Sequence, residues 1–329
     1  MSIRIAGTGS YLPERILTNA DLEKMVETSD EWIRSRTGIV ERHIAKPEES
    51  ASSMAKIAVE RALEAAALPA AEIDLIIVAS TTPDYSFPNT GCCLQHRIGA
   101  GKAFCFDLSA ACSGLLYGLA VAVSMLKTNR KYHYAVVCGS EKISQSIDWE
   151  DRNTCVLFGD GAGAILLERV DDGCDDDPLP AATLGSDGTY GDTLIVPAGG
   201  SRMPITRELI DQRQNCIKMK GKETFKFAVN CMVSSSRQIL AETGYTTGDL
   251  ALVIPHQANR RITQAVAARL EVPPEIVVDN IDLCANTSSA TIGIALDEVA
   301  RNGRMKRGDL VLLTAFGSGL TWGSMLFRY

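Results

Sequence analysis

Three short segments, far apart in the chain, each carry one side chain that could take part in acyl-group chemistry. They are residues 107–114 (DLSAACSG), 255–259 (PHQAN) and 286–290 (NTSSA). Cys112 supplies a thiol nucleophile, His256 an imidazole, and Asn286 a carboxamide that can donate hydrogen bonds. A thiol, an imidazole and a carboxamide brought together can form, transfer and decarboxylate acyl thioesters. The sequence therefore predicts an acyl-transfer site assembled from distant parts of the chain.

Cys112 lies where a strand pattern gives way to a helix pattern. Residues 104–108 have the composition of a strand, and residues 113–122 form an apolar helix pattern. At the start of a helix, unpaired N–H groups and the helix dipole favour an anion, so we expect this thiol to be more acidic than an ordinary cysteine. Position alone fits a buried structural cysteine equally well. The small neighbouring residues and the other two segments favour a nucleophile.

His256 follows a predicted buried strand, residues 250–254, and precedes a predicted helix, residues 260–270. A single histidine is more often structural than functional, but ligands bind at strand ends in α/β proteins, and this position favours a functional role. The other histidines stand in charged or mixed surroundings: His43, His96 and His133. Asn286 could cap the start of a helix, a role that is compatible with a place in an active site.

Two glycine-rich segments allow the backbone to approach a ligand closely. Residues 158–163 (FGDGAG) resemble a nucleotide-binding fingerprint, but they precede a strand pattern at 164–167 instead of opening a helix after one. We therefore reject a dinucleotide site. Residues 316–319 (FGSG) could offer backbone N–H groups to an oxyanion, with a simple tight turn as the alternative.

Helix and strand patterns alternate along the chain, which indicates an α/β protein. Residues 51–67 predict an amphipathic helix and residues 73–80 a buried strand. The same unit recurs at residues 234–243, which predict a helix, and at the strand pattern before His256.

A shift of 177 residues superimposes these two units without gaps and aligns Leu75 with Leu252. We therefore predict an internal duplication, in which equivalent strands end at a shared site. Residues 170–178 (VDDGCDDDP) are an acidic, turn-rich stretch typical of a connector. We place the boundary there, with one half at 1–171 and the other at 172–329.

Composition indicates a globular protein of 329 residues, with 46% hydrophobic and 22% charged positions. The longest apolar runs are interrupted far short of the roughly 20 residues that span a bilayer. The N-terminus has a strand pattern and not a signal-peptide pattern, so we expect a cytoplasmic protein. We expect the ten cysteines to be reduced, and no ligand spacing predicts a metal site. The net charge of −7 argues against general nucleic-acid binding.

Several motifs resemble those of the β-ketoacyl-acyl-carrier-protein synthase III family. They are residues 7–13 (GTGSYLP), 28–33 (TSDEWI), 36–39 (RTGI), 255–259 (PHQAN) and 316–323 (FGSGLTWG), so the resemblance covers essentially the whole chain. It implies a thiolase-like fold of five layers, αβαβα, and a homodimer. It also implies a decarboxylative Claisen condensation, in which acetyl-CoA and malonyl-acyl-carrier protein give acetoacetyl-acyl-carrier protein, CoA and CO2 without a cofactor. This is the first condensation of bacterial type II fatty-acid synthesis.

The resemblance also implies roles for individual residues. Cys112 would carry the acyl group, and His256 and Asn286 would donate hydrogen bonds to the malonyl thioester oxygen. The oxyanion hole would consist of the backbone N–H groups of Cys112 and Ser318. The family's coenzyme-A contacts correspond to Trp32, Arg36, Arg152, Met219, Gly221, Phe225 and Asn259. Its acyl pocket corresponds to Leu157, Phe158, Leu194, Ile217 and Phe316, with Phe87 closing the pocket of the partner subunit.

The carrier-protein surface of the family corresponds to Lys226, Arg261 and Arg269. Three positions depart from the family pattern. Ala285 and Asn153 stand where glycine is common, and Ser318 replaces a smaller residue. None of the three changes removes a catalytic group.

Other enzymes and binding proteins remain alternatives. A degradative thiolase would need a second catalytic cysteine, for which Cys284 is the only candidate near a motif, and a hydroxymethylglutaryl-CoA synthase would use a glutamate near Cys112. Asn286 argues against both. A papain-like protease has Cys, His and Asn in this order, but its local signature is missing. A non-catalytic acyl-binding protein would not need the three side chains together.

Overall fold

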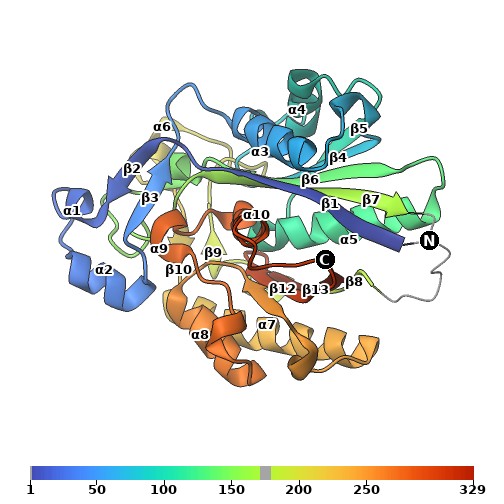
Figure 1. Ribbon diagram of the computed structural model, residues 1–329. Coiled ribbons are helices and arrows are strands. Elements are labelled where there is room, and N and C mark those ends of the chain that lie inside the picture. Colours follow the sequence, from blue (N-terminus) through green and yellow to red (C-terminus); the bar gives the residue numbers. More distant parts are fainter. Residues whose placement is uncertain (1, 171–178) are drawn as a thin grey trace.

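The computed structural model describes residues 2–170 and 179–329. Two sheets and three helix layers alternate in the order αβαβα, as Figure 1 shows. The N-terminal half forms a five-stranded sheet with the strand order β1-β7-β6-β4-β5. Its strands are β1 (Ser2–Tyr11), β7 (Gly161–Val170), β6 (Tyr134–Glu141), β4 (Leu75–Ala79) and β5 (Phe104–Leu108). β4 is parallel to both β5 and β6, and every residue of its LIIVA sequence is buried, as expected for a strand covered on both faces.

The C-terminal half repeats this sheet. Its strands are β8 (Ala181–Ser186), β13 (Thr321–Arg328), β12 (Leu310–Gly317) and β11 (Leu252–Pro255). The order β8-β13-β12-β11 matches β1-β7-β6-β4, and so do the directions, because β11 and β12 are parallel and the other pairs are antiparallel. A parallel bridge from Val253 to Val277 marks the place that β5 takes in the first sheet. The predicted duplication is therefore visible in the topology.

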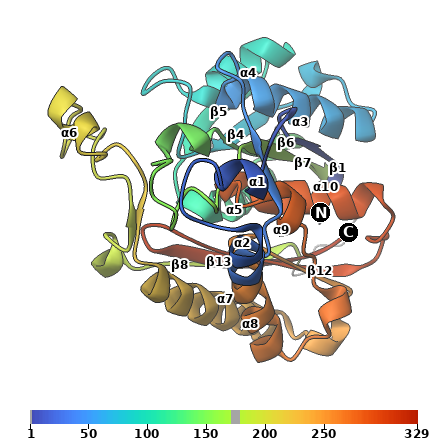
Figure 2. The same cartoon turned by 90° about the vertical axis from the view of Figure 1, so that its left-hand side faces the viewer.

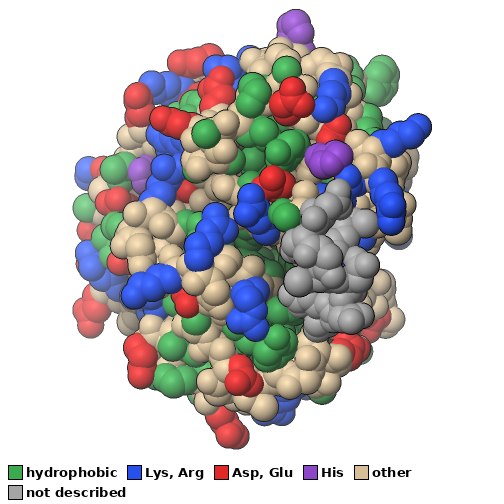
Figure 3. Space-filling view, turned by 45° about the vertical axis from the view of Figure 1, so that its right-hand side comes forward, with side chains coloured by type: hydrophobic (Ala, Val, Ile, Leu, Met, Phe, Trp, Pro, Cys, Tyr) green, Lys and Arg blue, Asp and Glu red, His purple; other side chains and the backbone are tan. Residues whose placement is uncertain are grey.

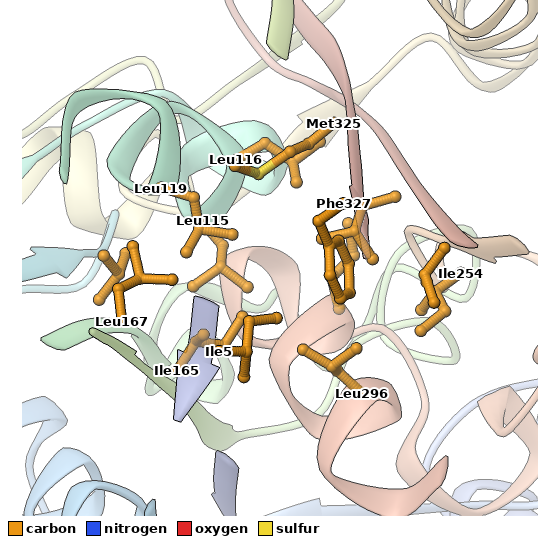
Figure 4. Packing of buried hydrophobic residues seen from close by; sticks show 14 of the residues in the cluster. Ile5, Leu115, Leu116, Leu119, Ile165, Leu167, Ile254, Leu296, Met325 and Phe327 are labelled. Carbon is orange, nitrogen blue, oxygen red and sulfur yellow. The ribbon is translucent and has the colours of Figure 1, made fainter. Parts of the chain in front are cut away.

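Helices cover both sheets and fill the space between them. The outer helices of the first sheet are α3 (Ala51–Ala65) and α4 (Thr90–Ile98), and those of the second are α7 (Gly221–Thr243) and α8 (Arg260–Leu270). The middle layer consists of α5 (Gly114–Thr128) and α10 (Thr291–Arg301). Figure 4 shows the core there, where Leu116 of α5, Leu296 of α10 and Phe327 of β13 pack together with neighbouring apolar side chains.

One stretch of the described chain, Ala111–Thr128, is long and apolar enough to cross a membrane by length and composition. The sequence analysis did not single it out. It contains α5, and more than half of the stretch is buried between the two sheets. A core helix of this kind passes the same test, because burial against two sheets demands an apolar surface on most sides.

The 177-residue shift holds at several points of the structure. Short 3-10 turns occupy residues 70–72 and 247–249, and β4 begins at Leu75 as β11 begins at Leu252. Further turns occupy residues 111–113 and 288–290, directly before α5 and α10. The proposed boundary between residues 171 and 172 lies outside the described residues, as does the acidic connector beyond Val170.

The remaining elements surround the ends of the sheets. They are the hairpin of β2 (Arg15–Thr18) and β3 (Glu41–Ile44), the pair β9 (Leu194–Ile195) and β10 (Lys218–Met219), and the short helices α1 (Asn19–Leu22), α2 (Asp30–Thr37), α6 (Arg207–Asp211) and α9 (Ile281–Cys284). Figure 2 shows α6 projecting away from the body of the molecule. Acidic and basic side chains are interspersed over the described part of the face in Figure 3.

Each predicted element overlaps an observed one, but two helices are longer than predicted. The helix predicted at 113–122 is α5, which continues to Thr128. Residues 51–67, 104–108 and 260–270 correspond to α3, β5 and α8. The helix predicted at 234–243 is only the end of α7, which begins at Gly221. Ala228, Val229 and Met232 are buried and continue its apolar face toward the N-terminus.

Candidate active site

The three segments singled out in the sequence meet at one cavity of about 580 Å³. Cys112, His256 and Asn286 all line it. Cys112 follows the end of β5 and precedes α5, and His256 follows the end of β11. Asn286 comes two residues after the end of α9. The site therefore lies at the carboxyl ends of strands from both halves, where ligands bind in α/β folds.

Backbone conformations that are rare for non-glycine residues occur at the turns of residues 111–113 and 288–290, which precede α5 and α10. Ala111, next to Cys112, has a φ of 47°, and Ser288 has a φ of 51°. Ala285, directly before Asn286, combines a φ of 54° with a ψ of −162°. Glycine adopts this last conformation at no steric cost, whereas alanine adopts it only with strain. Such strained residues gather at functional sites, where the surrounding structure holds them.

Burial dominates the chemistry of the Cys112 thiol. The side chain is 7% exposed, and its sulfur lies 3.6 Å from the hydroxyl oxygen of Ser288. Burial raises the pKa of Cys112 to about 12, and the carboxyl of Glu141 adds to the rise, while the hydrogen bond with Ser288 opposes it. The predicted acidic thiol is therefore wrong, because loss of water around the sulfur outweighs the start of the helix. Attack on a thioester then requires a group that accepts the thiol proton.

His256 is a neutral imidazole in this site. The ring is 2% exposed, and burial lowers its pKa to about 3. Its Nδ1 lies 2.6 Å from Oγ1 of Thr291, which in turn lies 3.1 Å from the carbonyl oxygen of Ser288. The Thr291 hydroxyl has one proton. If it goes to the Ser288 carbonyl, Nδ1 of His256 carries the ring proton and donates to Thr291; if it goes to Nδ1, the ring proton resides on Nε2 and makes that atom a hydrogen-bond donor. The sequence analysis did not identify Thr291, since no local pattern links it to His256.

The Asn286 amide is oriented by its own turn. Its Oδ1 accepts a hydrogen bond from the backbone N–H of Ser288 at 2.9 Å, which leaves the NH2 group as the donor. The amide therefore caps a turn, as the sequence allowed, and also lines the cavity. Its backbone N–H donates to the Leu157 carbonyl at 3.0 Å, and its carbonyl accepts from Gly159 at 3.1 Å. These bonds fix Asn286 against one wall of the cavity.

An aromatic ring and one arginine, Trp32 and Arg36, line the cavity, whereas Arg152 packs over the ring without being part of the lining. The guanidinium carbon of Arg152 lies 5.0 Å from the centroid of the Trp32 ring, and that of Arg36 lies 6.0 Å away. Asn259 donates a hydrogen bond to the Arg36 carbonyl at 3.0 Å. The other lining residues among the predicted coenzyme-A contacts are Met219, Gly221, Phe225 and Asn259. A flat indole with guanidinium groups near it suits a base with attached phosphates.

Four of the predicted acyl-pocket residues line the cavity: Leu157, Phe158, Leu194 and Phe316. Ile217 belongs to the same hydrophobic cluster as Leu157, Phe158 and Leu194 and does not reach the lining. Phe87 is 86% exposed and lies outside the cavity of its own chain.

The end of β12 passes directly beside the nucleophile. A Cβ atom on Gly317 would lie 2.7 Å from the backbone nitrogen of Cys112, so only glycine allows this approach. Ser318 follows, and its hydroxyl donates to the Leu194 carbonyl. Ser318 itself is not part of the cavity lining.

The predicted carrier-protein residues lie on α7 and α8, which pack side by side. Lys226, Arg261 and Arg269 are all exposed, but only Arg261 lines the cavity. Arg269 donates to Oδ1 of Asn230 at 2.6 Å.

The sequence analysis missed lining residues for which it predicted no role: Thr37, Asn153, Val156, Lys222, Thr224, Ala228, Met232, Ala258 and Ile262. Phe225, Ala228 and Met232 recur at helical spacing on α7. This signal was available, but it falls in the part of the helix that the prediction omitted. Cys284 packs with Ala290 and Ile294 outside the cavity lining, so it is not placed to act as a second catalytic cysteine.

Among the described residues, no group of three His, Cys, Asp or Glu side chains is arranged to hold a metal ion. The nine described cysteines are free thiols.

Comparison with known proteins identifies the family. Residues 106–188 match the 3-oxoacyl-[acyl-carrier-protein] synthase III family, and residues 240–329 match the family's C-terminal domain. β-Ketoacyl-[acyl-carrier-protein] synthase III of Caldanaerobacter subterraneus is 50% identical over 99% of this chain and 97% of its own. That of Roseiflexus castenholzii is also 50% identical, over 99% and 97% of the two chains.

Solved structures agree with these sequence relatives. The crystal structure of 3-oxoacyl-[acyl-carrier-protein] synthase III from Aquifex aeolicus is 46% identical, with a TM-score of 0.91 over 100% of both chains. The corresponding Pseudomonas aeruginosa structure is 39% identical, with a TM-score of 0.91 over 100% of this chain and 98% of its own. The predicted thiolase-like fold is confirmed, and the chain belongs to the β-ketoacyl-[acyl-carrier-protein] synthase III family.

Proposed function

We propose that this chain condenses acetyl-CoA with malonyl-acyl-carrier protein through a thioester on Cys112. As a member of its family, the chain is a condensing acyltransferase that starts bacterial fatty-acid synthesis. One observation carries the assignment of residues: Cys112, His256 and Asn286, from three distant segments, line one cavity. Each of them supplies a different group that the reaction needs.

In the first half-reaction, the sulfur of Cys112 attacks the thioester carbonyl of acetyl-CoA and expels the CoA thiolate. The negative charge that develops on the carbonyl oxygen is stabilised by the backbone N–H groups of Cys112 and Ser318. The close passage of Gly317 beside the Cys112 nitrogen supports this pairing, because it brings the two backbone segments together.

In the second half-reaction, the malonyl group loses CO2 and its enolate carbon attacks the acetyl thioester. The enolate oxygen accepts hydrogen bonds from Nε2 of His256, in the tautomer in which Thr291 donates to Nδ1, and from the NH2 group of Asn286. A neutral imidazole is the donor, because the pKa of His256 is lowered to about 3 by burial. No cofactor is expected, since the thioester activates the carbonyl and the loss of CO2 generates the carbanion.

Trp32 and Arg36 of the cavity lining, with Arg152 beside the indole, would hold the adenine and phosphates of coenzyme A. Bulky side chains at Leu157, Phe158 and Phe316 leave room for a short primer. Acetyl-CoA should therefore have a much higher kcat/KM than octanoyl-CoA. Comparable values for the two primers would contradict this assignment.

Acyl-carrier protein would dock on the exposed basic residues of α7 and α8, beside the cavity. The active form would be a homodimer in which the exposed Phe87 of each chain closes the acyl pocket of the other. We place the enzyme in the cytoplasm.

Incubation with radiolabelled acetyl-CoA, followed by peptide mapping, tests the assignment of the nucleophile. The label should reside on the peptide that contains Cys112. A label on any other cysteine would overturn the proposal.

A further inference from the structure

Glu141 is a buried carboxyl directly behind the nucleophile. It ends β6, is 0% exposed and does not line the cavity. Its oxygens accept hydrogen bonds from Ser288 Oγ at 3.1 Å, Ser289 Oγ at 2.8 Å, Thr82 Oγ1 at 2.8 Å and both Thr81 Oγ1 and N at about 3 Å. All of these donors are neutral. A buried carboxylate that is held by neutral donors, instead of a cation, is an uncompensated charge.

A continuous hydrogen-bonded path joins this carboxyl to the thiol. The sulfur of Cys112 lies 3.6 Å from Oγ of Ser288, and that oxygen lies 3.1 Å from Oε1 of Glu141. A serine hydroxyl can accept a proton from one neighbour while it donates its own to another. The position of Ser288 is fixed by its backbone N–H, which donates to Oδ1 of Asn286 at 2.9 Å.

We propose that Glu141 takes up the Cys112 proton through Ser288 when the thiol is acylated, and returns it when the thiol is released. The proposal rests on the acyl-Cys112 intermediate of the proposed function. Glu141 touches no substrate atom and acts through Ser288, so it is a positioning residue and not a catalytic one.

The bonds and protons balance over the cycle. In the first half-reaction, the S–H bond breaks, the S–C bond to the acetyl group forms, and the CoA thiolate leaves and takes a proton from water. The thiol proton passes to Ser288, and the Ser288 proton passes to Glu141. In the second half-reaction, the enolate carbon attacks the acetyl carbon and Cys112 leaves as a thiolate. Glu141 then returns its proton through Ser288, so one cycle consumes one proton from solvent.

The electrostatics of the site support this role. Burial raises the pKa of Glu141, although its hydrogen bonds oppose the rise, so its affinity for a proton moves toward that of the buried thiol. Proton transfer during acylation leaves a neutral thioester and a neutral carboxyl in a water-poor region, which removes the uncompensated charge.

Other titratable groups around Glu141 do not compete for this role. His256 is reached only through Thr291 and the Ser288 carbonyl, and burial lowers its pKa to about 3. The adjacent Lys142 turns its ammonium group to the backbone carbonyls of Lys46 and Glu49.

Two neighbouring serines provide a matched test. Ser288 and Ser289 both donate to the same oxygen of Glu141, but the Cys112 sulfur is hydrogen-bonded to Ser288. The measurement is the single-turnover rate of acetylation by acetyl-CoA, followed by intact mass, as a function of pH. In the wild type this rate should fall as pH decreases through the raised pKa of Glu141, because a protonated carboxyl accepts no proton.

Ser288→Ala should slow acetylation by about 100-fold or more and remove this fall at low pH, because the path to the base is lost. Ser289→Ala should keep the rate at high pH within a few-fold. It should also shift the fall to higher pH, because Glu141 loses a donor that favours its charged form. Equal effects of the two substitutions, or an unchanged pH profile in Ser288→Ala, would overturn the proposal.

Glu141→Gln separates a relay from simple electrostatics. Removal of a nearby negative charge lowers the pKa of the thiol, so a purely electrostatic role predicts faster acetylation. The relay predicts a loss of about 100-fold. Faster acetylation would overturn the proposal, and the serine pair decides if this variant does not fold. A label on a residue other than Cys112 in the wild type would instead refute the proposed function.

Discussion

The turn before α5 and the turn before α10 have similar backbone conformations but carry side chains of different chemistry. Ala111 and Ser288 stand at equivalent positions, 177 residues apart, with φ angles of 47° and 51°. Each turn also packs against the end of a strand from the other half through a glycine. A Cβ on Gly317 would meet the Cys112 nitrogen at 2.7 Å, and one on Gly139 would meet the Ser289 carbonyl oxygen at 2.3 Å.

The side chains make the difference between the two turns. The N-terminal turn presents Cys112 to the cavity, whereas Ser289 takes the equivalent position in the C-terminal turn and donates to the buried Glu141. His256 and Asn286 also come from the C-terminal half. Under the proposed function, the duplicated scaffold would divide the reaction between its halves, with the nucleophile in one and the donors for carbanion formation in the other.

The largest effect is expected at the N-terminal turn. Cys112→Ala should abolish acetylation and, with it, condensation of acetyl-CoA with malonyl-acyl-carrier protein, because no other described thiol combines a helix start with the donors of the C-terminal half. Intact mass after exposure to acetyl-CoA measures the first step, and product formation measures the second. Circular dichroism should show a folded protein. Normal condensation by this variant would remove Cys112 from the role of nucleophile.

Substitutions in the C-terminal half should separate the two half-reactions. His256→Ala or Asn286→Ala should still allow Cys112 to accept acetyl, while condensation falls by about 100- to 1000-fold, as for the loss of one oxyanion donor. A mass increase by one acetyl group, without condensation product, is the expected result. If neither variant became acetylated, the proposed division between the halves would be wrong.

The sequence predicted the site better than it predicted the state of its groups. Cys112, His256 and Asn286 lie at boundaries between elements, where patterns are readable, and the structure brings them together. The prediction of an acidic thiol was wrong, because burial of the sulfur depends on packing between layers, which no local pattern encodes. Glu141 and Thr291 were missed for a related reason, since their partners are distant in sequence.

A smaller effect is expected where the carrier protein would dock. Acyl-carrier proteins are acidic and this chain has a net charge of −7, so docking requires locally basic residues. Arg261→Glu should raise the KM for malonyl-acyl-carrier protein several-fold and hardly change acetylation by acetyl-CoA. The wild-type KM should also rise with salt, because exposed charges are screened.

Arg130→Glu provides the control for Arg261→Glu. Arg130 is exposed in the loop after α5 and does not line the cavity, and its substitution changes the net charge by the same amount. It should leave the KM for the carrier protein close to the wild-type value. Equal increases in both variants would show an effect of net charge alone, and no increase in Arg261→Glu would exclude Arg261 from the docking surface.

The smallest effect concerns the strained residue beside Asn286. Ala285 has a φ of 54° and a ψ of −162°, a region that glycine adopts freely and other residues adopt at a cost of about 1–3 kcal/mol. Substitution by glycine would relieve this strain, but two effects oppose the relief. Loss of the buried methyl group costs about 0.8 kcal/mol, and the greater conformational freedom of glycine in the unfolded chain costs about as much. Ala285→Gly should therefore raise the free energy of unfolding by about 1 kcal/mol or less, measured by urea denaturation.

Ala67→Gly is the matched control for Ala285→Gly, because Ala67 also has a positive φ, 51°, but lies after α3 and outside the cavity lining. Its substitution should change stability without changing activity. Ala285→Gly should in addition lower the condensation rate more than the acetylation rate, because a freer backbone holds the Asn286 amide less firmly. A loss of stability well beyond about 1 kcal/mol in Ala285→Gly would show that its backbone is not strained. Equal losses in both half-reactions would show that Asn286 is not confined to the decarboxylation step.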